Sequence, residues 1–97
     1  MNILQKCAKV PELEDRARIL RVAYLELSGW DKWMPVSAFY ELAAVEMVLE
    51  RGWWVWRREH YQVVQLETAA PRFVYAVLAT APTLLEACLA ALEANHE

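Results

Sequence analysis

Residues 52–79 read GWWVWRREHYQVVQLETAAPRFVYAVLA, and this stretch decides the fold. It predicts three β-strands, Trp53–Arg58, Tyr61–Glu67 and Phe73–Ala79. Because side chains alternate across a strand, Trp54 and Trp56 point to one side of the sheet while Trp53 and Val55 point to the other. Both sides of the predicted sheet are therefore apolar.

Two short connections join these strands. Arg57–His60 is a polar turn, and Thr68–Arg72 is too short to hold a crossover helix. Both connections therefore predict antiparallel neighbours and a three-stranded meander. An ordinary antiparallel sheet has one polar face, so a sheet that is apolar on both faces is expected to carry helices on both.

Two helices are expected before the sheet. The first, about residues 12–28, places apolar residues on one stripe: Leu13, Ala17, Leu20, Tyr24 and Leu27. Its first turn is acidic, which suits the helix dipole, and Glu14 is spaced to pair with Arg18 four residues later. Residues before Pro11 can add a short helix of their own.

The second helix, about residues 37–51, is expected to begin after Ser37 as its N-cap and to end at Gly52. Its expected buried stripe is Ala38, Leu42, Val45 and Leu49. Other apolar residues surround this stripe over more than half of the helix, so this helix should be the better buried of the two. A final helix, about residues 83–95, opens on a capping box between Thr83 and Glu86.

These elements predict an α+β fold of one domain spanning residues 1–97, in the order α-α-β-β-β-α. The architecture expected is a three-layer α/β/α sandwich around a three-stranded antiparallel sheet. The 97 residues carry 10 Lys and Arg against 13 Asp and Glu, a net charge of −3, which disfavours nonspecific nucleic-acid binding. No stretch predicts a membrane span or a secretory signal, so the expected location is the cytoplasm of a host cell.

The C-terminal two-thirds, about residues 37–95, resembles the phage ABA-sandwich domain family of small phage and prophage proteins. The matching segments are Arg51–Trp56 (RGWWVW), Phe73–Ala79 (FVYAVLA) and Thr80–Leu92 (TAPTLLEACLAAL). The resemblance implies a virus-associated accessory protein, and it carries over no catalytic residues. The first helix and the loop after it lie outside the match.

The tryptophans of the first strand, Trp53, Trp54 and Trp56, are interpreted as sheet core, because both faces of their strand are apolar. The functional alternative is a platform on which the bases of single-stranded nucleic acid stack, with Arg57 and Arg58 nearby. The chain's acidity and the absence of an RNA-recognition signature argue against that alternative.

The stronger candidates for partner binding lie outside the sheet. Trp30, Asp31, Lys32 and Trp33 form a loop in which exposed aromatics would mark a contact site, the alternative being packing onto the first helix. An acidic set on the second helix comprises Glu41, Glu46 and Glu50. It is either a solvated helix face or a negative surface that docks on a nucleic-acid-binding protein.

Motifs of catalysis and metal binding are missing. Cys7 and Cys88 are far apart and have no Cys or His beside them at ligand spacing, so both are expected to be reduced. No cofactor, metal or catalytic residue is expected. The leading hypothesis is a non-enzymatic phage or prophage accessory protein that binds a host or phage protein, as an inhibitor of a defence or transcription factor would, and that also forms a homo-oligomer.

Overall fold

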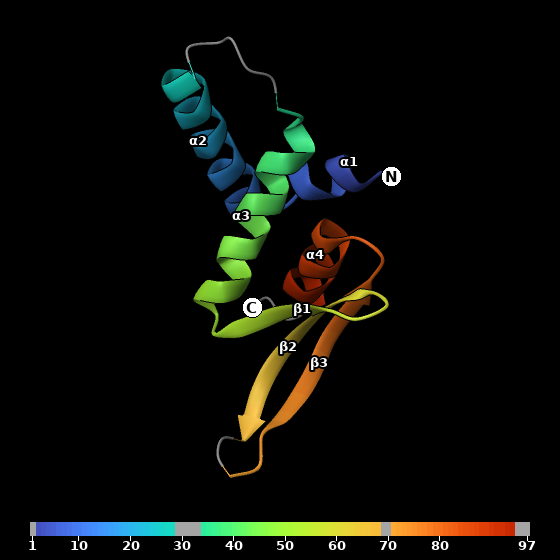
Figure 1. The fold of residues 1–97 in the computed structure, drawn as a ribbon. Coiled ribbons are helices and arrows are strands. Elements are labelled where there is room, and N and C mark those ends of the chain that lie inside the picture. The colour runs from blue at the N-terminus through green and yellow to red at the C-terminus, as the bar shows by residue number, and fades with distance from the viewer. Residues whose placement is uncertain (1, 29–33, 69–70, 95–97) are drawn as a thin grey trace. The chain divides into compact units, whose positions relative to one another are not determined.

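The computed structural model describes residues 2–28, 34–68 and 71–94, and the chain divides into two compact units, residues 1–44 and 45–97. The division falls within a helix, α3. The elements, in chain order, are drawn in Figure 1. They are α1 (Ile3–Ala8), α2 (Pro11–Ser28), α3 (Val36–Glu50), β1 (Trp53–Arg57), β2 (Tyr61–Thr68), β3 (Val74–Ala81) and α4 (Leu84–Ala94).

The first unit holds α1, α2 and the beginning of α3. The short α1 is fixed by a capping box, in which Asn2 and Gln5 each accept a hydrogen bond from the other's backbone N–H. The predicted α2 is confirmed, although only Leu13 and Ala17 of its apolar stripe are fully buried. Leu27, at the far end of the stripe, is 89% exposed.

The orientation predicted for α3 is wrong. Leu42 and Leu49 of its expected buried stripe are exposed, and Ala38 and Val45 are half-buried. The buried residues lie on the neighbouring arc: Phe39, Tyr40, Ala43, Ala44, Met47 and Val48. A helix that is apolar over more than half its circumference has no single stripe in its sequence, so periodicity cannot choose between the two arcs. The helix also begins at Val36, before the expected cap at Ser37.

The second unit is built on the sheet, whose strand order is β1-β2-β3 and whose neighbours are antiparallel, as predicted. Gly52 leads from α3 into β1 with a φ of 79°, a conformation that favours glycine. The pairing of β2 with β3 shifts register between Val63 and Val64, which leaves Leu78 as an extra residue in β3.

Helix α4 packs against β2 and β3. It begins after Thr83, whose hydroxyl accepts a hydrogen bond from the backbone N–H of Glu86 at 3.2 Å, one half of the predicted capping box. Its buried residues form most of this unit's helical core: Leu85, Ala87, Cys88, Leu89, Ala91 and Leu92. On the sheet, Trp53, Val63 and Val64 are buried.

The α+β class and the order α-α-β-β-β-α are confirmed, with α1 as an additional short helix. The expectation that all three tryptophans of β1 form sheet core needs correction. Trp53 is buried, but Trp54 is 60% exposed and Trp56 is half-buried. Within the second unit α4 packs on β2 and β3, and on the opposite face of the sheet Trp54, Leu66, Tyr75 and Val77 are exposed while Val64 is buried.

Candidate binding surface

The strand register places a set of apolar residues on the face of the sheet opposite Trp53 and Val63. Directly paired residues of antiparallel strands share a face, so Trp54, Val64 and Val77 form one row across the three strands. Leu66 and Tyr75 form the next row on one side. We call this surface the apolar sheet face, and it comprises Trp54, Trp56, Val64, Leu66, Tyr75 and Val77.

Large apolar side chains on this face are open to solvent. Trp54 is 60% exposed, Val77 52%, Leu66 44% and Tyr75 42%. Single exposed apolar residues are ordinary on protein surfaces, but neighbours that form a contiguous patch mark an interaction site. This face is therefore the candidate binding surface of the second unit.

An aromatic contact organises the face. The rings of Trp56 and Tyr75 meet edge to face, with their centroids 5.1 Å apart. Val64 lies in the row between those of the two aromatics, and its side chain is fully buried. The indole N–H of Trp56 donates a hydrogen bond of 2.6 Å to the side-chain oxygen of Gln62, which fixes the ring.

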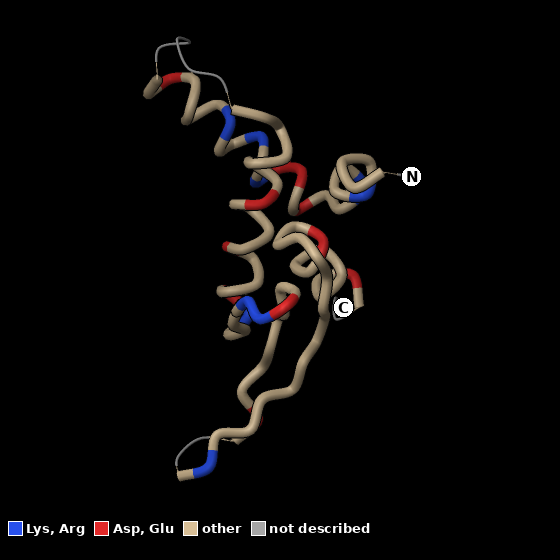
Figure 2. The backbone as a smooth tube through the Cα atoms, turned by 45° about the vertical axis from the view of Figure 1, so that its right-hand side comes forward, with Lys and Arg blue, Asp and Glu red and all other residues tan. Residues whose placement is uncertain are grey.

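Charge is confined to the ends of the strands. Figure 2 shows long uncharged stretches along the sheet, with basic and acidic residues gathered at the turns. Within the three strands only Arg57 and Glu67 are charged, each near the end of its strand. Arg58, in the β1–β2 turn, lies over the ring of Trp56 at 5.2 Å. The face is thus apolar in its middle and basic at one corner.

The predicted partner-binding loop, Trp30, Asp31, Lys32 and Trp33, lies outside the described residues. Of the predicted acidic set, Glu46 and Glu50 are exposed in the second unit, and Glu41 is half-buried in the first.

The alternation of side chains predicts that Trp54 and Trp56 share one face, and that Tyr75 and Val77 share one side of their strand. Both sets are predicted to be core because a helix is expected above them. The detectable signal was the nearly charge-free alternation of β1 and β3.

The first unit contains a separate cleft of about 200 Å³, whose lining includes Arg18, Arg21 and Phe39. At its side the hydroxyl of Tyr40 donates a hydrogen bond to the carboxylate of Glu14. Burial, followed by this hydrogen bond, raises the pKa of Tyr40 to about 12. Tyr40 therefore stays protonated at neutral pH and is the hydrogen-bond donor in this contact.

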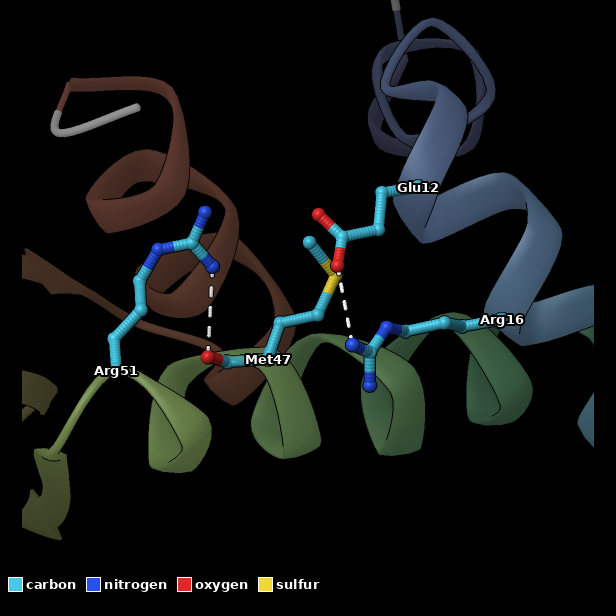
Figure 3. Close-up of polar contacts among 4 residues, drawn as sticks. All are labelled: Glu12, Arg16, Met47 and Arg51. Atoms are coloured by element: carbon cyan, nitrogen blue, oxygen red, sulfur yellow. Dashed lines mark hydrogen bonds and ion pairs between the residues drawn. The ribbon is translucent and has the colours of Figure 1, made fainter. Parts of the chain in front are cut away.

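Ion pairs on α2 differ from the predicted pairing of Glu14 with Arg18. Arg18 pairs instead with Asp15 at 3.0 Å, and Arg16 pairs with Glu12 at 3.1 Å. The latter pair is drawn in Figure 3, which also shows Arg51, in the second unit, reaching back to the carbonyl of Met47 at 3.5 Å. The carboxylate of Glu14 accepts a hydrogen bond from the hydroxyl of Tyr40.

Among residues 2–28, 34–68 and 71–94, no cluster of three or more His, Cys, Asp or Glu side chains is arranged to hold a metal ion. Cys7 and Cys88 are both buried. None of the described helices combines the length and apolarity needed to cross a membrane.

Comparison with known proteins finds no matching family model, no matching curated protein and no matching solved structure.

Proposed function

We propose that this chain is a non-enzymatic binding protein that docks another protein on the apolar sheet face. The observation that carries the proposal is the row Trp54–Val64–Val77, in which a buried valine is flanked by a tryptophan and a valine that are each more than half exposed. Exposed tryptophan and tyrosine around an apolar centre are the residues that dominate binding energy at protein interfaces.

The biological setting proposed is that of a phage or prophage accessory protein in the host cytoplasm, which follows from the resemblance over residues 37–95. In that setting the partner is a host or phage protein, and inhibition of a host defence or transcription factor is the activity we propose. The partner's contact surface should itself be apolar, because the middle of the face offers no charge to pair with.

The test compares capture of proteins from a bacterial lysate by three immobilised forms of the chain. Trp54→Ser removes the most exposed aromatic of the face, and Leu27→Ser removes an even more exposed apolar residue, from α2, as a control. We expect one protein to be retained by the wild type and by Leu27→Ser and lost by Trp54→Ser. Capture that Trp54→Ser leaves unchanged would exclude the apolar sheet face.

The loop predicted from sequence provides a further arm of the same experiment. A Trp30→Ala, Trp33→Ala double variant tests whether that loop contributes to binding. Loss of the captured protein in this variant, with retention by Trp54→Ser, would move the binding surface from the sheet to the loop.

A second candidate function is single-stranded nucleic-acid binding on the same face. It is favoured by the guanidinium of Arg58 lying over Trp56, next to the exposed rings of Trp54 and Tyr75. Fluorescence anisotropy of a labelled oligothymidine at low salt separates the two functions. Binding that weakens with salt and with Arg58→Gln would support nucleic acid, whereas a flat titration removes this candidate.

A further inference from the structure

The sheet has two edges, and they are unequal. β1 has five residues, ends in Arg57 and is followed by Arg58, whereas β3 has eight residues, Val74–Ala81, with no charged residue and no proline. In the strand order β1-β2-β3, one side of β3 is paired with β2, and no described strand lies on its other side. Natural proteins often keep an edge strand short, place charges on it or kink it, which prevents pairing with another chain. β3 is neither short nor charged.

The irregularity in β3 limits where pairing can occur. Leu78 is the extra residue of one bulge, and the register shifts again between Leu66 and Thr68, opposite Tyr75 and Val74, so the regular run before Leu78 is Tyr75–Val77. Within it Tyr75 and Val77 point to the apolar sheet face, and Ala76 points to the opposite face. A strand added here has to match this short regular segment.

We infer that β3 pairs with β3 of a second copy of this chain, antiparallel and with a two-fold axis through Ala76. This register places Tyr75 of each copy directly opposite Val77 of the other. Aromatic and β-branched residues opposite each other on one face form a favourable cross-strand pair, and the symmetry provides that pair twice. Ala76 meets its own counterpart at the axis, where small side chains fit.

The occupant is a second copy because the segment complements itself. Any foreign strand would need its own apolar residues at the two matching positions, whereas a second copy has them by symmetry. The result is one six-stranded sheet in which the two apolar sheet faces become continuous. The joined segment is short, so the dimer is expected to dissociate on dilution. The inference concerns the edge and is independent of the partner proposed for the face.

The first measurement is sedimentation of the full-length chain over a range of concentrations, and we expect a concentration-dependent monomer–dimer equilibrium. A chain that stays monomeric throughout overturns the inference. The variant Tyr75→Lys, Val77→Lys places like charges opposite each other across the joint and should weaken the dimer about tenfold or more. Trp54→Lys, Leu66→Lys adds the same charge to the same face on β1 and β2, outside the joint itself, and this control should dimerise like the wild type.

The register is tested by disulfide formation. Ala76→Cys places two thiols opposite each other at the axis, within the range a disulfide spans, and should yield a covalent dimer on mild oxidation. Thr80→Cys is the control, because its two copies would be about 27 Å apart along the paired strands. Wild type, with Cys7 and Cys88 buried, should remain uncrosslinked. Edge pairing is refuted if Ala76→Cys fails to crosslink the dimer and if only the Trp54→Lys, Leu66→Lys control dissociates it. The two copies would then join through their apolar sheet faces.

Discussion

The indole of Trp56 and the phenol of Tyr75, from the first and third strands of the sheet, meet edge to face with centroids 5.1 Å apart. The two residues are not strand neighbours, so their contact bridges β2 and spans the row that contains Val64. Val64, in that row, is fully buried, whereas Trp54, Leu66, Tyr75 and Val77 on the same face are exposed. The apolar sheet face is therefore a preformed surface, held by its own aromatic contact.

A double-mutant cycle measures that bridge. Trp56→Leu and Tyr75→Leu, made singly and together, should show a coupling free energy of about 1 kcal/mol, the size typical of an aromatic pair. Urea unfolding by circular dichroism gives the four free energies, at a protein concentration low enough to keep the chain monomeric. Strictly additive single effects would mean that the two rings do not stabilise each other.

The two sides of the sheet should respond differently to truncation of a leucine. Leu89 of α4 is 2% exposed, and Leu89→Ala should lower the free energy of unfolding by about 2–4 kcal/mol through lost burial and a cavity. Leu66 lies on the open face at 44% exposure, and Leu66→Ala should cost less than about 1 kcal/mol. Equal losses in urea unfolding would indicate that the apolar sheet face is covered in the isolated chain.

The elements of the second unit were predictable from sequence because their signals are local. Alternating apolar residues in β1 and β3, the short connection at Arg57–His60 and the Thr83 cap each depend on a few neighbouring residues. The register also followed in part, since Trp54 and Trp56 were placed together on one face. What alternation cannot show is whether a helix covers that face.

The errors have a common physical origin. Apolar residues such as Trp54, Leu42 and Leu49 were assigned to the core because apolar side chains are usually buried, yet all three are exposed. Burial depends on what packs against a surface, which is a tertiary property that the sequence of one element does not contain. The composition indicates more apolar residues than a chain of this size can bury. The residues left exposed form the candidate binding surface.

Gly52 should be sensitive to substitution for a purely backbone reason. Its φ is 79°, and a Cβ added to it would have no atom within 4 Å, so crowding plays no part. Gly52→Ala should therefore lower the free energy of unfolding by about 1–2 kcal/mol, while Gly52→Asn should cost less because asparagine tolerates this conformation. Thermal unfolding of the two variants beside the wild type checks the order. An Asn variant that is less stable than the Ala variant would contradict the explanation.

The contact between Tyr40 and Glu14 should make stability fall at alkaline pH. The pKa of Tyr40 is raised from 10.0 to about 12, so above pH 10 the unfolded chain loses the tyrosine proton that the folded chain retains. The unfolded state then binds fewer protons than the native state, and the free energy of unfolding decreases as pH rises. This contribution is fully present below pH 10 and is lost by about pH 12, a change of about 2–3 kcal/mol.

Urea unfolding at a series of pH values, for wild type and Tyr40→Phe, isolates that contribution, because other alkaline titrations are common to both proteins. The free energy of unfolding of the wild type minus that of Tyr40→Phe should stay constant up to about pH 10 and should decrease above it. Glu14→Gln keeps a hydrogen-bond acceptor but removes the negative charge, so the fall should begin at a similar pH and be smaller. A difference that does not change with pH would mean that Tyr40 titrates alike in the folded and unfolded chains.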